Sequence, residues 1–303
     1  MGVYCSAFAL TIFFIIFAEY WYKKCASCKY ANLTCSDMRF KFEKAFVSAD
    51  YLADKKAYLQ YKTKYLIYTV LAILPLFFIA AVRFDVGTDY FYTYVPEFNN
   101  SLQGAMPYSE WGFNVLIKII QLFTTNPQWL FVVTSLIYVS LLINTIVKYS
   151  KDAAISVIVV IISCFYFISL NNVRQSIATL FVFAAFPYLV DRKTIPYLAY
   201  IAMAYMFHVS AIIMVVPYVV LHFKFIKKYF NFLVVLLFAL MPLLCKLAEV
   251  VLMNTKYGYY FDSQYDNGEI NWQFFFVQFF AFAFAMYCSR NIDKNDNQAF
   301  VLI

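Results

Sequence analysis

Long apolar runs dominate the sequence and constrain its fold more than any other feature. A transmembrane helix needs about 20 mainly apolar residues, because lipid tolerates only backbone whose hydrogen bonds are satisfied internally. With 64% apolar residues, 14% charged residues and a mean hydropathy of +0.68, the composition excludes a soluble globular protein, a disordered chain and a small disulfide scaffold. The candidate spans are Val3 to Tyr22, Tyr65 to Val82, Trp129 to Val147, Ala153 to Leu170, Gln175 to Val190, Tyr229 to Leu247 and Ile270 to Cys288.

Two further apolar segments fit a single span less well. Trp111 to Phe123 is short and carries Lys118, which favours an amphipathic or re-entrant helix. Ile195 to Phe223 is too long for one span and is interpreted as a hairpin of two short helices that turns near His208. The predicted fold class is therefore all-α, a polytopic integral membrane helical bundle of about 8–10 membrane helices, including short or re-entrant ones.

The distribution of basic residues predicts how the bundle is oriented. If Trp111 to Phe123 does not cross, 19 of the 24 Lys and Arg fall in loops on one side, which the positive-inside rule makes cytoplasmic. These loops are 23–64, 148–152, 191–194, 224–228 and 289–297. The net charge of +7 is then a signal of topology and not of a nucleic-acid partner. If the short helix crosses, Lys148, Lys151, Arg192 and Lys193 would face outward instead.

The preferred topology gives a single membrane domain over residues 1–303. It has a cytoplasmic basic loop at 23–64, which is expected to lie on anionic lipid, and outer-face loops at 83–128 and 248–269. Val3 to Tyr22 has no basic region before it and no small-residue cleavage site after it, so we expect a retained span with the N-terminus outside. The apolar end from Ala299 to Ile303 looks like the start of another apolar segment, so we expect either that the chain is truncated or that its last span is missing from the sequence.

The first polar cluster runs from Arg83 to Tyr94, at the outer end of the second span. An ionisable residue at the edge of a membrane is costly and points to function, and here Arg83, Asp85 and Asp89 surround a glycine. Gly87 gives the backbone freedom for a tight turn, and Thr88 or Asp89 could cap the next helix. An interfacial arginine paired with Asp85, beside a belt of tyrosines, is the alternative interpretation.

The second cluster, Asn171-Asn-Val-Arg-Gln175, lies in an outer turn between two spans. Arg174 is on the side where the positive-inside rule disfavours it, and an arginine can hold a phosphate or carboxylate through two hydrogen bonds. The alternative is a helix N-terminus capped by Asn171 or Asn172, with Arg174 on lipid phosphate.

The third cluster is Phe207-His-Val-Ser210, where the long apolar segment must turn. A histidine can serve as acid or base near neutral pH, although a lone histidine among apolar residues is more often structural. The topology places Arg83, Arg174 and His208 at one membrane face. We therefore predict a shared outer-face cavity for an anionic, phosphate-bearing substrate.

Metal-binding patterns are weak in this sequence. Cys25, Cys28 and Cys35 have part of the spacing of a zinc site but no fourth ligand, so reduced cytoplasmic thiols are the preferred interpretation. Asp85 with Asp89, and Asp262 with Asp266, are four residues apart and could each share a helix face and bind a cation. We predict no metal and no cofactor.

The three clusters together resemble the EpsG family, which is related to the Wzy-like polymerases of bacterial exopolysaccharide, capsule and O-antigen. The resemblance covers about Tyr65 to Tyr229. It is carried by an arginine followed by Val86-Gly-Thr-Asp-Tyr90, by Asn172-Val-Arg-Gln175 before Ile177-Ala178, and by Phe207-His-Val-Ser-Ala211. Two departures are the longer Cys-containing basic loop and a chain that stops before the further spans such proteins usually carry.

The resemblance implies a glycosyltransferase that transfers a polyprenyl-diphosphate-linked glycan onto a sugar hydroxyl of another lipid-linked unit, at the outer face of the inner membrane. The implied catalytic residues are His208, Asp89 and Arg174. The implied residues for binding diphosphate or glycan are Arg83, Asp85, Gly87, Thr88, Tyr90, Glu110, Asn172, Gln175 and Ser210. Glu110 is also a candidate base, and Tyr90, Tyr92 and Tyr94 could stack on sugar rings.

The partners implied are the lipid-linked glycan, membrane lipid, a flippase and chain-length regulators, with no nucleic acid. Two other functions stay open. A flippase or transporter of lipid-linked oligosaccharide would use the same arginines without catalysis, although the sequence lacks the internal repeat that is typical of transporters. A non-catalytic truncated subunit is the third hypothesis.

Overall fold

The structure is a computed structural model that describes residues 2–28, 49–106 and 108–222, with single residues between 229 and 253. Its described residues are helices joined by turns and short loops. The spans expected at Tyr229 to Leu247 and Ile270 to Cys288 lie outside the described residues except for single positions in the first. The outer loop 248–269, with Asp262 and Asp266, likewise lies outside them except for single positions before 254.

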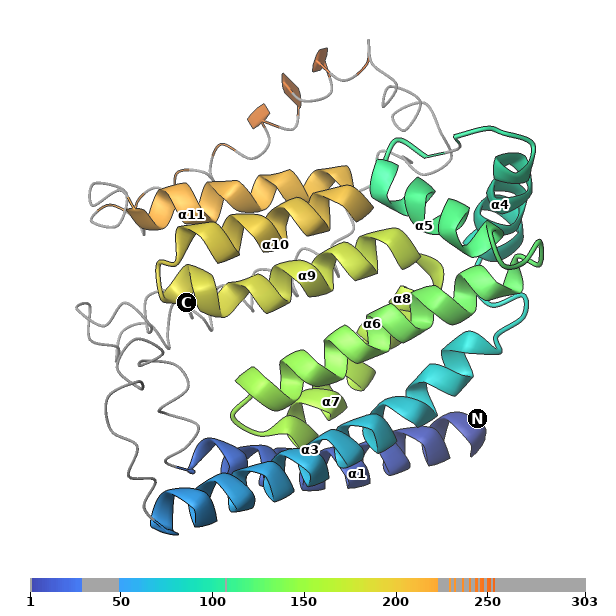
Figure 1. The fold of residues 1–303 in the computed structure, drawn as a ribbon. Helices are drawn as coiled ribbons and strands as arrows, with labels where there is room; N and C mark the ends of the chain where they lie inside the picture. Colours follow the sequence, from blue (N-terminus) through green and yellow to red (C-terminus); the bar gives the residue numbers. More distant parts are fainter. Residues whose placement is uncertain are drawn as a thin grey trace. The chain divides into compact units, whose positions relative to one another are not determined.

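The helices follow the expected order and confirm a polytopic all-α membrane protein (Figure 1). Among the described residues, four helices are long and apolar enough to cross a membrane, namely Gly2–Ala26, Ala53–Ala81, Gln128–Tyr149 and Val173–Val190. The helical elements are α1 (Gly2–Ala26), α3 (Ala49–Ala81), η1 (Tyr90–Tyr94), α4 (Val95–Leu102), α5 (Trp111–Gln121), α6 (Gln128–Tyr149), α7 (Ala153–Ile162), α8 (Phe165–Asn171), α9 (Val173–Val190), α10 (Thr194–Phe207), η2 (Val209–Met214) and α11 (Val215–His222).

The chain forms two compact units, residues 1–188 with 194–213 and residues 189–193 with 214–303. In the first unit α1 and α3 lie side by side along their length (Figure 1). Phe17 stacks on Tyr68 and Trp21 stacks on Tyr61 at this contact. Helix α3 begins at Ala49, so residues 49–64 of the predicted basic loop 23–64 are helical.

The short helix α5 does not carry the chain across the bundle. The side chain of Gln128, at the start of α6, donates hydrogen bonds to the carbonyls of Ala81 (2.7 Å) and Arg83 (3.1 Å) at the end of α3. The end of α3 and the start of α6 therefore meet at one end of the unit (Figure 1). Helix α5 buries Phe113 and Ile117 in this region, as an amphipathic helix does.

The predicted single span from Ala153 to Leu170 is wrong in one respect, because it is broken. Helices α7 and α8 meet at an angle of 56°. Cys164 at the break has a φ of 61°, a left-handed conformation that ends α7 before α8 starts. The segment contains no proline or glycine, so the sequence carries no signal for this bend.

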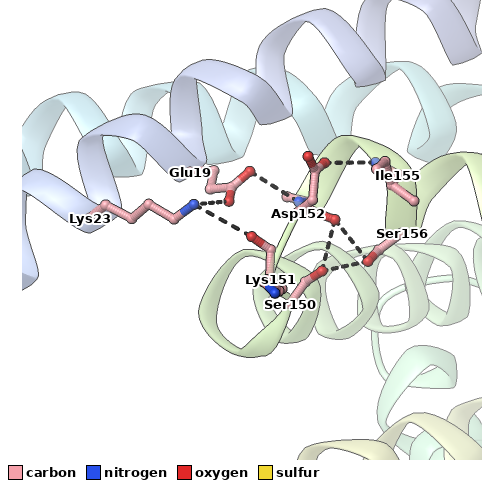
Figure 2. A network of polar contacts seen from close by, with 8 residues as sticks. Glu19, Lys23, Ser150, Lys151, Asp152, Ile155 and Ser156 are labelled. Carbon is pink, nitrogen blue, oxygen red and sulfur yellow. Dashed lines mark hydrogen bonds and ion pairs between the residues drawn. The ribbon is translucent and has the colours of Figure 1, made fainter. Parts of the chain in front are cut away.

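The start of α7 is held by a network at the end of α1 (Figure 2). Asp152 caps α7 by accepting a hydrogen bond from the Ile155 amide (2.9 Å). The buried carboxylate of Glu19 accepts a second hydrogen bond, from the Ala153 amide (3.0 Å), and pairs with Lys23. These contacts satisfy two of the free amides of the helix N-terminus.

Helix α10 ends at Phe207, and a new helical segment begins at Val209. The break therefore falls at His208, where the sequence predicts a turn. The amide of His208 still donates to the carbonyl of Ala204 (2.9 Å), and its own carbonyl accepts from Ala211 (3.1 Å). His208 is thus fixed at the end of α10, within the first unit.

Candidate functional site

The loop that follows α3 is anchored by one asparagine side chain from the end of α8. The Oδ1 atom of Asn171 accepts hydrogen bonds from the amide of Asp89 (3.0 Å) and from the hydroxyl of Thr88 (3.4 Å). Gly87 has a φ of +85°, and a Cβ atom there would lie 2.6 Å from the same oxygen. Glycine is therefore required at this position by both backbone conformation and space.

Arg174 lies in the first turn of α9 and reaches across to the residues before α5. Its Nη1 atom donates a hydrogen bond to Oε2 of Glu110 at 2.7 Å. The guanidinium group also lies over the ring of Tyr108, 4.2 Å from its centroid, in a cation–π contact. Asn114 fixes Tyr108 by exchanging hydrogen bonds with its backbone, at 3.3 and 2.6 Å.

Glu110 also faces His208. The Nδ1 atom of His208 lies 3.3 Å from Oε1 of Glu110, close enough for an ion pair when the ring is protonated, but without the angle of a hydrogen bond. The side chain of Glu110 is only 5% exposed, and those of Arg174 and His208 are 24% and 29% exposed. A buried carboxylate thus joins two partly accessible groups that come from different helices.

The approach of α5 to α10 depends on a glycine. A Cβ atom at Gly112 would lie 2.6 Å from Cβ of Met206 and 2.8 Å from the Met206 carbonyl oxygen. Gly112 is two residues after Glu110, and Met206 is two residues before His208. The absence of a side chain at Gly112 therefore allows Glu110 and His208 to come together.

The surroundings shift the pKa values of Glu110 and Asp89 in opposite directions. Burial alone would raise the pKa of Glu110, but the charge of Arg174, hydrogen bonds from Ser109 and its own backbone, and His208 hold that pKa below its ordinary value. Burial raises the pKa of Asp89, and Arg174 only partly offsets this. Glu110 is therefore a stable carboxylate at neutral pH, and Asp89 holds a proton more readily than an ordinary aspartate.

Arg83 does not join this group, although it lies at the same end of the unit. Its side chain is buried against the ring of Phe131, with the guanidinium carbon 4.7 Å from the ring centroid. It donates to the Ala80 carbonyl (3.3 Å) and the Ser135 hydroxyl (3.5 Å), and it lines a small cavity with Tyr138 and Ser169. Of Arg83, Arg174 and His208, which were expected to share a cavity, only Arg174 and His208 come together, through their contacts with Glu110.

The other predicted site residues are spread around this end of the unit. Tyr90 is buried, and its ring stacks on that of Phe131 with the ring centroids 4.3 Å apart. Its hydroxyl donates a hydrogen bond to the side-chain oxygen of Gln128 (2.8 Å). Of the three tyrosines expected to stack on sugars, Tyr90 and Tyr94 are buried and Tyr92 is 87% exposed. Asp85 is exposed in the loop with a φ of 50°, and Asn172 directly follows α8 and accepts a hydrogen bond from the side chain of Asn171 (3.1 Å). Gln175 is exposed on α9, and Ser210 is exposed in η2.

Sequence reasoning missed three residues that build the site: Tyr108, Asn114 and Gly112. Tyr108 is one of 27 tyrosines and lies in a loop, so it had no pattern to single it out. Gly112 is one of only six glycines and lies inside a predicted helix, which is a signal of close packing. Asn114 was also visible as a polar residue on the apolar face of α5.

The candidate cation pair in the loop is not formed as predicted. Asp85 and Asp89 do not share a helix face, because both precede η1. Within the described ranges, no group of three or more His, Cys, Asp or Glu side chains could hold a metal ion. Cys25 and Cys28 are buried free thiols at the end of α1, and Cys35 lies outside the described residues.

Comparison with known protein families gives one match, which covers residues 66–303 and describes the EpsG family. The chain belongs to the EpsG family. This is a Wzy-like polymerase family, and the match covers all three site residues Glu110, Arg174 and His208. No curated protein and no solved structure matches the chain. The family match and the apolar helices make this chain a membrane protein of a polymerase family.

Proposed function

We propose that this EpsG family member polymerises lipid-diphosphate-linked oligosaccharide units into exopolysaccharide, capsule or O-antigen. The observation that carries the proposal is the meeting of Arg174, Glu110 and His208 at one end of the bundle. This glycosyl transfer requires a cation that can bind diphosphate and a group that can accept a proton. Both are partly accessible, and both are positioned by one buried carboxylate.

The proposed reaction is a displacement at the anomeric carbon of the donor glycan. An acceptor hydroxyl oxygen forms a bond to that carbon, and the bond from the carbon to the polyprenyl diphosphate oxygen breaks. The hydroxyl proton passes to a base, and the electron pair of the broken bond leaves on the diphosphate. Because the diphosphate is itself the activated leaving group, the step needs neither a nucleotide sugar nor a metal.

Arg174 is the proposed diphosphate-binding residue. Nη1 of Arg174 donates to Glu110, and the guanidinium also interacts with the hydroxyl of Tyr94. Its buried Nε has no hydrogen-bond partner in the described part of the chain. A guanidinium that is held on one side by a carboxylate and supported by the Tyr108 ring is pre-organised to stabilise the charge that develops on the leaving group. Arg83 supports the same end of the bundle from its buried position.

His208 is the proposed base, with Glu110 as its positioning residue. Nδ1 of the ring faces the carboxylate, which favours the tautomer that carries its proton on Nδ1 and leaves Nε2 able to accept the hydroxyl proton. Asp89 is the alternative base, because it lies close enough to Arg174 for the charge of Arg174 to affect its pKa. Glu110 is less suited to this role, because Arg174 holds its pKa low and occupies one of its oxygens.

We place the reaction at the outer face of the inner membrane, with a flippase that supplies the lipid-linked units and chain-length regulators as partners. The charge distribution of the sequence supports this orientation, because the predicted topology assigns the site to the side opposite most of the basic loops. The glycan and membrane lipid are the molecules that the protein must bind.

The test uses purified protein in vesicles that contain lipid-linked repeat units on both leaflets. We expect glycans longer than one unit to form, with no increase in the number of units that cross the bilayer. If units cross but no longer glycans form, the protein is a flippase and the proposal fails. If neither occurs while a labelled lipid-linked unit still binds, the non-catalytic subunit hypothesis replaces it.

A further inference from the structure

A second cavity lies along the half of α6 that is far from Glu110. It is partly open, has a volume of about 350 Å³ and is bordered by α6, α9 and α10. The far end of α6 is about 30 Å from its start at Gln128, since each of its 22 residues adds about 1.5 Å. This cavity is therefore separate from the site around Arg174.

One face of α6 gives the cavity an unusual polar stripe. Ser140, Asn144 and Lys148 are four residues apart and all border the cavity, with Thr145 beside them. Asn144 donates a hydrogen bond to the Ser140 carbonyl (2.8 Å). Polar groups inside a membrane span are costly, and such groups point to a bound molecule or a path for one.

The part of the cavity lined by Lys148 can bind an anion. Lys148 is exposed and makes no hydrogen bond or ion pair with the described part of the protein. Tyr149 and Tyr200 also border the cavity, and both interact through their hydroxyls with Tyr188. An ammonium group beside phenol hydroxyls supplies the donors that a phosphate group accepts from.

Nearby acidic side chains do not neutralise Lys148. Glu19 forms an ion pair with Lys23 and accepts a hydrogen bond from the Ala153 amide, and Asp152 caps α7, as Figure 2 shows. Lys23 also donates a hydrogen bond to the Lys151 carbonyl (3.5 Å), so several lysines lie at this end of the unit. Apolar side chains, among them Ile137, Leu141 and Phe181, also line the cavity.

We propose that this cavity is a binding site for an anionic membrane phospholipid. The phosphate lies against Lys148 and the tyrosine hydroxyls, and one acyl chain lies along Leu141 and Phe181. Free phosphate does not fit the observations as well, because it would leave the apolar walls without a partner. Basic pockets between transmembrane helices are known sites for anionic lipid headgroups. The site is independent of the proposed polymerase activity.

The test is native mass spectrometry of the delipidated full-length protein titrated with phosphatidylglycerol or phosphatidylcholine. We expect tighter binding of phosphatidylglycerol, and about a fivefold weakening of it in Lys148→Ala, the effect of one lysine near an anionic headgroup. Lys151→Ala is the matched control and should bind like the wild type. Leu141→Trp, which fills the cavity and keeps Lys148, should also weaken binding, and unchanged unfolding temperatures will show that the variants fold.

Three results would overturn the proposal. The first is equal affinity for the two lipids, and the second is an equal loss in Lys148→Ala and Lys151→Ala. The third is displacement of phosphatidylglycerol by inorganic phosphate at equal concentration, which would mean that the acyl chain contributes nothing. None of these results bears on chain extension, so a failure here is distinct from a failure of the polymerase proposal.

Discussion

At the scale of single residues, Glu110 organises the candidate site. Its two carboxylate oxygens face different partners, Oε2 toward Arg174 and Oε1 toward His208. The sequence marked Arg174 because an arginine is unusual on the outer side, and His208 because the chain has two histidines. It could not show that Glu110 links them, because Glu110 is 64 residues from Arg174 along the chain.

The ion pair of Glu110 predicts a specific dependence of stability on pH. Because the folded pKa is lowered, the pair stabilises the fold above the ordinary glutamate pKa of about 4.3, and this contribution is lost as the pH falls through the folded pKa. Glu110→Gln should therefore lower the unfolding temperature at neutral pH, with a difference from wild type that shrinks in acid. Thermal unfolding in detergent at several pH values measures this difference.

The control is Glu97→Gln, which removes a carboxylate that forms no ion pair within the described residues. A Glu110→Gln difference that stays constant with pH contradicts the account.

The contact between Tyr108 and Arg174 predicts that the ring matters and the hydroxyl does not. The hydroxyl is buried without a hydrogen-bond partner among the described residues, so Tyr108→Phe should fold at least as stably as the wild type and retain chain extension. Tyr108→Ala removes the cation–π contact and should slow chain extension about tenfold. Equal losses in the two variants would assign the role to the hydroxyl instead.

At the scale of helices, the site depends on where elements end and how closely they approach. Helix α5 begins directly after Glu110, α9 begins directly before Arg174 and α10 ends directly before His208. The sequence predicted a break near His208 from the excess length of the apolar run. It did not predict the bend between α7 and α8, because an unbroken apolar run looks the same whether it is straight or bent.

The close approach at Gly112 is the prediction that belongs to this scale. Gly112→Ala places a methyl group against the Met206 backbone, which must move α5 away from α10 and separate Glu110 from His208. A misplacement of about 1 Å can cost about a hundredfold in rate, so we expect a loss of that order in chain extension. The control is Val115→Ala, on the exposed side of the same helix. A Gly112→Ala variant as active as Val115→Ala would show that this packing does not position the site.

At the scale of the whole molecule, hydropathy and charge predicted most of the architecture. The long spans appear in the expected order, and the ends of α3 and α6 meet, as the placement of basic residues required. These patterns show at which end of a bundle a residue lies. They could not show which residues touch there, and for that reason Arg83 was expected beside Arg174 but is buried against Phe131.

The orientation in the membrane is a prediction that labelling can test. In a cysteine-free background, Tyr92→Cys and Ser210→Cys place exposed thiols at the end that holds the candidate site. We expect a membrane-impermeant reagent to label both in intact cells, and Lys151→Cys only after the membrane is opened, because the positive-inside rule predicts that the basic loops face the cytoplasm. Labelling of Lys151→Cys from outside would reverse the orientation.

The central claim, that Arg174 binds the diphosphate in a polymerisation reaction, is tested most directly by the rate of chain extension in vesicles. Loss of one pre-organised donor to a developing negative charge costs about a hundredfold or more, so Arg174→Ala should lower the rate at least that much. Arg192→Ala, which removes an arginine from the turn after α9, should extend glycans at the wild-type rate. Equal rates for Arg174→Ala and Arg192→Ala would contradict the account.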